Sequence, residues 1–161
     1  VASPDGAYAV FSAHGKPLLL IDVATLATRV LAKVDPYFNL ATPVAWTPDS
    51  RHVAFAPQGT DKVHIYSIEQ QAVVSTKTGV GPWVETLSWS PDMQRIAAFG
   101  FVNRRMNKTP LGLLWASAGH PEFRNDGVLN VYRIGDDRCF SVVLKRGISE
   151  MGSANIEIEW K

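Results

Sequence analysis

Four histidines, a single cysteine and three regularly spaced aspartates are the residues that could do chemistry in this 161-residue chain. The histidines would suit a metal ion, but His14, His52, His64 and His120 lack the close spacing of metal ligands. Cys139 would suit a nucleophile, yet a lone cysteine on a strand predicts a small packed hydrophobe. No phosphate-binding loop, G-x-S-x-G elbow or H-E-x-x-H motif occurs. The sequence therefore predicts no catalytic residue, no metal and no cofactor.

The aspartates belong to three copies of one pattern, in which serine or threonine, proline and aspartate follow one another. Three carboxylates on one face of the molecule are one interpretation of this spacing. Proline at the second position of a turn presets its φ, however, and the next aspartate can accept backbone N–H bonds. We therefore favour three turns. Their prolines, 44 and 43 positions apart, are Pro4, Pro48 and Pro91, and their aspartates are Asp5, Asp49 and Asp92.

Short β-forming runs surround the turns and must position them. The runs before the second and third turns end in Trp46 and Trp89, each two residues before the proline. A unit of four strands joined by hairpins, with a period near 43, fits a β-propeller blade. The predicted strands are 8–11, 19–23, 28–32, 43–46, 52–56, 63–68, 72–75, 86–89, 95–99, 129–134 and 139–144.

The tryptophan-x-proline-aspartate turns resemble those of WD-repeat and TolB-like β-propellers. The resemblance implies an all-β fold with three four-stranded antiparallel blades of a larger ring. The expected units are 1–46, 47–89 and 90–161. The middle strands contain Ile-Asp at 21–22, Tyr-Ser at 66–67 and Tyr-Arg at 132–133, where a WD repeat has Trp-Asp. We therefore expect a divergent WD-repeat or TolB-like propeller.

The repeat tryptophans Trp46, Trp89 and Trp160 are expected to fill the wedges between neighbouring blades. Trp160 lies 71 positions after Trp89, which is one period plus 28 residues. Propellers close with about four to eight blades, so three blades would leave two apolar faces open. The expected partners are therefore the remaining blades, from the same or another chain, or a second copy that completes a six-bladed ring.

The extra residues of the third unit predict an insertion loop over 102–127. Loops longer than about 12 to 15 residues are uncommon and often functional. An exposed apolar stretch flanked by basic residues is typical of a protein-binding site, although the apolar residues could equally fold back onto a blade. The candidate partner-binding residues are Arg104, Arg105, Lys108, Leu113, Leu114, Trp115, His120 and Arg124.

The composition excludes several classes of partner. A net charge of +1 with no basic block predicts no nucleic-acid binding, and no apolar run is long enough for a membrane helix.

The leading hypothesis is a non-catalytic scaffold that binds other proteins, in the cytoplasm or nucleus. Residues 126–160 loosely resemble aladin-like nuclear-pore propellers. The alternatives are a periplasmic TolB-like propeller that docks a lipoprotein, the accessory propeller of a serine peptidase, and a propeller lactonase.

Overall fold

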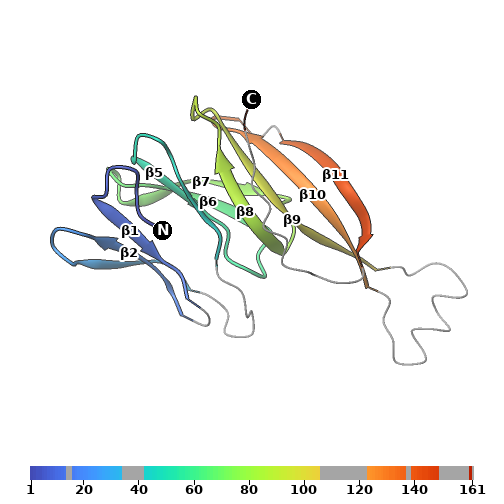
Figure 1. Ribbon diagram of the computed structural model, residues 1–161, viewed down its shortest axis with the longest axis horizontal. Coiled ribbons are helices and arrows are strands. Elements are labelled where there is room, and N and C mark those ends of the chain that lie inside the picture. The colour runs from blue at the N-terminus through green and yellow to red at the C-terminus, as the bar shows by residue number, and fades with distance from the viewer. Residues whose placement is uncertain (14–15, 34–41, 106–122, 137–138, 149–159, 161) are drawn as a thin grey trace, which may run out of the picture.

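The computed structural model describes residues 1–13, 16–33, 42–105, 123–136, 139–148 and 160, with the backbone alone at 103–105, 123–125 and 144–148. Every regular element in these residues is a β-strand, which confirms the all-β class. No helix in this part of the chain could span a membrane. The strands form three antiparallel sheets that lie side by side in chain order (Figure 1).

The first sheet contains β1 (Tyr8–Phe11), β2 (Leu18–Asp22) and β3 (Thr28–Ala32). The second contains β4 (Val44–Trp46), β5 (His52–Phe55), β6 (Lys62–Ser67) and β7 (Ala72–Thr78). The third contains β8 (Trp83–Trp89), β9 (Arg95–Arg105), β10 (Phe123–Arg133) and β11 (Cys139–Ile148). Neighbours along the chain are neighbours in each sheet, so every sheet is a meander.

All three sheets share one register around the Pro-Asp turns. Trp46 pairs with Val53, and Trp89 pairs with Ile96. In the first sheet an isolated bridge joins Ala2 to Ala9 at the equivalent position. The amino group of Val1 also donates to the Val10 carbonyl oxygen at 2.8 Å. The first two residues therefore occupy the place that β4 and β8 occupy in the other sheets.

The hydrogen-bonded sheets are displaced by one strand from the repeat units. Because β4 and β8 precede their turns, each sheet combines the end of one unit with the body of the next. The unit bounds 1–46, 47–89 and 90–161 stay a prediction about the sequence repeat. The sheets approach each other through their first strands, since β4 and β8 are in contact.

Alternation along the strands gives the second sheet two apolar faces. On β6, Tyr66 belongs to the core between the first two sheets, whereas Val63 and Ile65 belong to the core between the second and third. The first core includes Val10, Leu18, Leu20, Trp46, Val53 and Phe55. The second includes Ala54, Val80, Val84, Leu87, Trp89, Ile96, Ala98 and Tyr132.

The third sheet differs from the expected loop bounds of 102–127. The ladder between β9 and β10 continues to the pair Arg105–Phe123, so 102–105 and 123–127 belong to strands. Residues 101–105, Phe-Val-Asn-Arg-Arg, carry no clear alternation, and the sequence pattern alone could not show a strand there. A hairpin that has already formed can extend through backbone hydrogen bonds alone.

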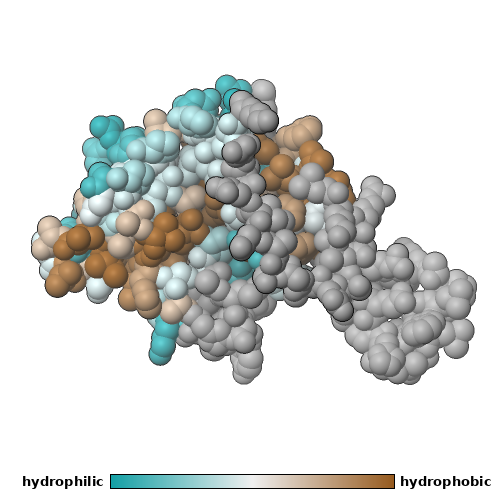
Figure 2. All heavy atoms as spheres, in the orientation of Figure 1, coloured by the Kyte–Doolittle hydropathy of each residue, from teal (hydrophilic) through white to brown (hydrophobic). Residues whose placement is uncertain are grey.

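The two outer faces of the stack expose apolar side chains. Figure 2 shows apolar residues gathered over the first sheet at one end and over the third sheet at the other. Phe11 and Val30 of the first sheet are 49% and 54% exposed, and Phe140 of the third is 69% exposed. Single exposed hydrophobes are common, but grouped apolar faces mark interfaces.

Candidate functional site

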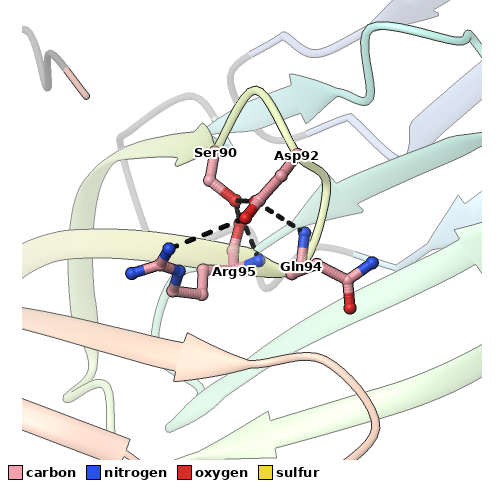
Figure 3. Close-up of polar contacts among 4 residues, drawn as sticks. All are labelled: Ser90, Asp92, Gln94 and Arg95. Atoms are coloured by element: carbon pink, nitrogen blue, oxygen red, sulfur yellow. Dashed lines mark hydrogen bonds and ion pairs between the residues drawn. The ribbon is translucent and has the colours of Figure 1, made fainter. Parts of the chain in front are cut away.

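Each Ser/Thr-Pro-Asp turn is closed by its own side chains. In the third turn the Ser90 hydroxyl donates to Asp92 Oδ1 at 2.5 Å and accepts from the Arg95 N–H at 2.9 Å (Figure 3). The same Asp92 oxygen accepts from the Gln94 N–H at 3.0 Å. The Arg95 guanidinium lies 3.6 Å from the second carboxylate oxygen. The contacts of the Asp92 carboxylate are therefore made within its own turn.

The first two turns repeat this arrangement. Asp5 accepts from the Ala7 N–H at 3.0 Å, and Asp49 accepts from the Arg51 N–H at 3.1 Å. The hydroxyl two residues earlier is the largest cause of a pKa below the ordinary value for Asp5, Asp49 and Asp92. These carboxylates accept hydrogen bonds from the backbone of their own turns, as the interpretation of the motif as a turn predicts.

The residue after each aspartate has a positive φ, which is 73° at Gly6, 61° at Ser50 and 57° at Met93. Glycine adopts this conformation without steric cost, whereas a side chain at Ser50 or Met93 is strained. Ser50 also forms a contact between sheets, because its hydroxyl accepts from the Asp5 N–H at 3.1 Å. The thioether of Met93 replaces that hydroxyl in the third sheet.

The repeat tryptophans join successive sheets by one type of contact. The indole N–H of Trp46 donates to the Val1 carbonyl oxygen at 3.4 Å, and that of Trp89 donates to the Ala45 carbonyl oxygen at 3.1 Å. Both tryptophans are more than nine-tenths buried. Each bond crosses from the first strand of one sheet to the preceding sheet, so we name the two interfaces the first seam and the second seam.

Trp160 makes a third contact of this kind on the outer face of the third sheet. Its indole N–H donates to the Ser88 hydroxyl at 3.1 Å, and Ser88 precedes Trp89 as Ala45 precedes Trp46. The guanidinium carbon of Arg95 lies 6.0 Å from the centre of the Trp160 ring, within cation–π range. Trp160 therefore sits where the next sheet of a propeller would begin.

The first seam is crossed at its outer side by Arg29 of β3. Its guanidinium donates to the Tyr66 hydroxyl at 3.1 Å and to the Gln71 side-chain oxygen at 2.7 Å. A third bond reaches the Gln71 carbonyl oxygen at 3.2 Å. The space left around these residues is about 190 Å³.

The second seam has a larger groove at the equivalent place, about 590 Å³. Register places Arg29 opposite Leu20 and Ser75 opposite the equivalent Ile65, so Ser75 stands where the first seam has its arginine. Tyr132, the equivalent of Tyr66, donates to the Thr78 carbonyl oxygen at 3.0 Å, and burial raises the pKa of its hydroxyl. The groove is lined by Thr47, Asp49, His52, Ile65, Val74, Ser75, Lys77, Trp89, Met93, Gln94, Ile134, Gly135 and Asp136.

The predicted partner-binding residues fall on the β9–β10 hairpin and its loop. Arg104 pairs through the backbone with Arg124, and Arg105 with Phe123, so these three arginines share the end of one ladder. Outside the described residues lie Lys108, Leu113, Leu114, Trp115 and His120.

The remaining titratable groups form no catalytic cluster among the described residues. No three of the histidine, cysteine, aspartate and glutamate side chains there could share a metal ion. His64 shares a hydrogen bond with the Thr76 hydroxyl at 2.9 Å and packs on the Phe55 ring. In the pairing of β5 with β6 it lies opposite Phe55, whereas His52 lies opposite Ser67, so the two histidines are not paired. The expectation that Cys139 is packed was wrong, because it lies exposed on the edge strand β11.

Sequence analysis missed the groove of the second seam. Only part of the signal was present in the sequence, because the 43-residue period sets Ser50 against Met93, whereas the equivalence of Arg29 and Ser75 follows from the strand register. Each of these differences between the repeats removes a side chain that crosses the first seam. A search for repeats detects the residues that the units share and overlooks such differences.

The chain matches no protein-family model and no curated protein by sequence. Among solved structures, it is similar to Kuenenia stuttgartiensis hydrazine synthase, with 18% identity, a TM-score of 0.56, and coverage of 91% of this chain and 35% of that one. A second is the Myceliophteria thermophila Cps50 (Swd1) β-propeller domain, with 12% identity, a TM-score of 0.50, and coverage of 92% and 57%. The WD40 repeats of RRP9 match at 13% identity and a TM-score of 0.56, with coverage of 88% and 35%.

These likenesses confirm the β-propeller fold. The chain spans between about a third and just over half of each of these three structures. At such low identity the comparison concerns the fold, and an enzyme stands among the similar structures beside WD40 domains. Function must therefore be argued from the residues of this chain.

Proposed function

We propose that this chain is a section of a β-propeller that serves as a non-catalytic scaffold and binds a protein partner through the β9–β10 hairpin. The observation that carries the proposal is the length of these strands. Each has 11 residues, whereas the equivalent β5 and β6 have 4 and 6. At roughly 3.4 Å per residue, the seven residues of β9 beyond the end of β5 extend the sheet by about 24 Å. A rigid ladder of this length suits presentation of a recognition loop.

The charge of this hairpin supports a macromolecular partner. Arg104, Arg105 and Arg124 lie at its end in consecutive ladder positions, and the segment 106–122 joins its strands. Arginine is enriched at the centres of protein interfaces because its guanidinium forms several hydrogen bonds at once. A nuclear-pore propeller, a TolB-like propeller and a propeller attached to a hydrolase are narrower forms of the same proposal, and the identity of the partner would distinguish them.

The proposal further includes a neighbouring blade on the outer face of the third sheet. Trp160 supports this part, because its bond to Ser88 repeats the contacts by which Trp46 and Trp89 join their sheets. Ala97, Leu129 and Val131 face the same side as their equivalents Ala54, Val63 and Ile65, which pack in the second seam. The outer face is therefore suited to another propeller sheet.

Affinity purification with quantitative mass spectrometry tests the hairpin. One tagged variant replaces 106–122 by Asn-Gly, and a matched control replaces the hairpin tip 69–71 of the second sheet by a neutral turn of equal length. We expect proteins that co-purify with the unaltered protein and the control to be lost from the hairpin variant. Equal recovery with all three forms, at equal far-ultraviolet circular dichroism, would refute the role of the hairpin.

Light scattering tests the neighbouring blade. The 161-residue chain should self-associate through its open face, and Val131→Glu should reduce that association, whereas Val73→Glu on the exposed outer strand β7 should not. A wild-type chain that stays monomeric at tens of micromolar would contradict this part of the proposal. A discrete dimer would instead favour a ring completed by two copies.

A further inference from the structure

Two arginines lie directly opposite each other on the outer face of the third sheet. Arg95 of β9 pairs with Arg133 of β10, and alternation places both on the same face as Val131. The equivalent pairs in the first and second sheets are Tyr8 with Asp22 and His52 with Ser67. Like charges directly opposite each other on a sheet are destabilising. The third sheet therefore carries a repulsive pair at a position where the other two sheets have none.

The acidic neighbours of the two arginines satisfy only part of their charge. Arg95 Nη2 lies 3.6 Å from Asp92 Oδ2, and Arg133 Nη1 lies 4.0 Å from Asp136 Oδ2. Both distances exceed the roughly 3.2 Å limit of a good N–H···O hydrogen bond, and both arginine side chains are more than half exposed. Exposed ion pairs of this kind contribute little, and a guanidinium has several N–H donors. Both side chains can therefore bind a further acceptor.

Apolar and aromatic side chains surround the arginine pair. Both arginines line a hollow of about 440 Å³ that also includes Val131, Phe140 and the Trp160 ring. The Phe140 side chain is 69% exposed, and the guanidinium carbon of Arg95 lies 6.0 Å from the centre of the Trp160 ring. This combination of an apolar surface with two cations at its rim is suited to a polypeptide that carries an acidic side chain.

In both seams, a hairpin tip of the following sheet lies beside the equivalent of the arginine pair. In the first seam, Gln71 lines one hollow together with Tyr8 and Asp22. In the second seam, Asp136 lines one groove together with His52, and Lys77 of the second sheet donates to the Asp136 carbonyl oxygen at 2.5 Å. A sheet packed in the same way on the outer face of the third sheet would bring its hairpin tip to the arginine pair.

We propose that the outer face of the third sheet binds a further propeller sheet whose hairpin tip places an aspartate or glutamate between Arg95 and Arg133. This inference rests on the neighbouring blade of the proposed function and specifies the chemistry of its contact. A carboxylate forms charge-assisted hydrogen bonds with both guanidinium groups and offsets their repulsion. The first sheet of a second copy fits poorly, because its tip at 24–25 is Ala-Thr and its Asp22 carboxylate accepts from the Thr25 N–H at 2.9 Å.

The probe is the blocked peptide acetyl-Ile-Gly-Asp-Asp-Ile-amide, which contains the tip sequence of residues 134–137. The peptide with two asparagines is its uncharged control, and sodium acetate supplies a free carboxylate. Binding is followed by the arginine Nε–H and indole N–H signals of the isotope-labelled chain, at a concentration below that of self-association. We expect the signals of Arg95, Arg133 and Trp160 to move, with a dissociation constant on the order of 1 mM and about tenfold weaker binding of the control peptide. Equal binding of both peptides, or equally tight binding of acetate, would overturn the proposal.

Arg95→Gln and Arg133→Gln should each weaken binding of the acidic peptide to the level of the asparagine peptide. Arg51→Gln is the matched control, because Arg51 is an exposed arginine beside the equivalent turn of the second sheet and should leave binding unchanged. Full binding by both arginine variants refutes the acidic contact. If the chain self-associates but the peptides bind equally, only this inference fails, whereas a monomeric chain refutes the neighbouring blade and this inference with it.

Discussion

The two seams of this molecule have the same tryptophan contact at their inner side and different contacts at their outer side. Inside, each is joined by a tryptophan whose N–H reaches a backbone carbonyl oxygen of the preceding sheet. Outside, the first is crossed by Arg29 and Ser50, whereas the second is crossed by Lys77, which donates to the Asp136 carbonyl oxygen, and keeps a larger groove. Contacts to the backbone persist through any change of the side chain at the accepting position, whereas contacts between side chains are lost with one substitution. The repeat therefore constrains the inside of a seam more tightly than its outside.

The largest expected effect tests the shared part of the seams. Trp46→Ala and Trp89→Ala should each lower the free energy of unfolding by about 3 to 5 kcal/mol, because both leave a cavity in a buried core. Urea denaturation measures the change. The Phe substitutions are controls that keep most of the packing and should cost only about 1 kcal/mol for the lost hydrogen bond. Clearly unequal losses at the two positions would show that the inner contacts are not equivalent.

Removal of the crossing arginine should have a smaller effect that separates the seams. Arg29→Ala is expected to lower the free energy of unfolding by about 1 kcal/mol, since three hydrogen bonds of a partly exposed side chain are lost. Ser75→Ala at the equivalent position of the second seam should change it by less than about 0.5 kcal/mol. Thermal denaturation of both variants measures the two changes in stability, and similar shifts would contradict a difference between the seams.

Glycine at the strained turn position should act with opposite sign in the two turns. Met93→Gly relieves a positive φ and is expected to raise the free energy of unfolding by about 0.5 to 1 kcal/mol. Ser50→Gly relieves the same conformation but loses the bond to the Asp5 N–H, so it should be neutral or destabilising. Stabilisation by both substitutions would mean that the Ser50 contact contributes nothing to the first seam.

The smallest effect is a pH dependence that belongs to the first seam. Partial burial lowers the pKa of His64 below its ordinary value of 6.5, with a smaller contribution from the charge of Lys62. Because the folded state disfavours the protonated ring, this contribution to stability is complete above about pH 6.5 and is lost as the pH falls toward the folded pKa. His64→Gln should flatten stability between pH 7 and pH 5. An unchanged slope in this variant would assign the dependence to other groups.

The sequence predicts the parts of this fold that rest on local rules. Proline, aspartate and a hydroxyl fix each turn within six residues, and alternation of apolar residues fixes the strands beside it. The register of Trp46 with Val53 and of Trp89 with Ile96 follows from those turns. The bounds of most strands were therefore predictable to within one to three residues.

Features that depend on contacts between sheets were not predictable in this way. Strands β9 and β10 stay paired through hydrophilic residues because the hairpin has already aligned them. No alternation of apolar residues in the sequence indicates this pairing. The groove of the second seam is lined by Ser75 and Met93, which stand where Arg29 and Ser50 cross the first seam, and the alignment of Ser75 with Arg29 comes only from the register of the sheets. Cys139 looked like a core residue by type, but β11 is an edge strand.

The displacement between repeat unit and sheet has a consequence for how such a chain can evolve. A stretch from one Pro-Asp turn to the next, such as 47–89, encodes three strands of one sheet together with the first strand of the following sheet. Tandem duplication of this gene segment adds a sheet and a complete tryptophan contact at the same time. No new kind of junction is needed, and ring size can change in whole steps while each copy later drifts at the outer side of its own seam.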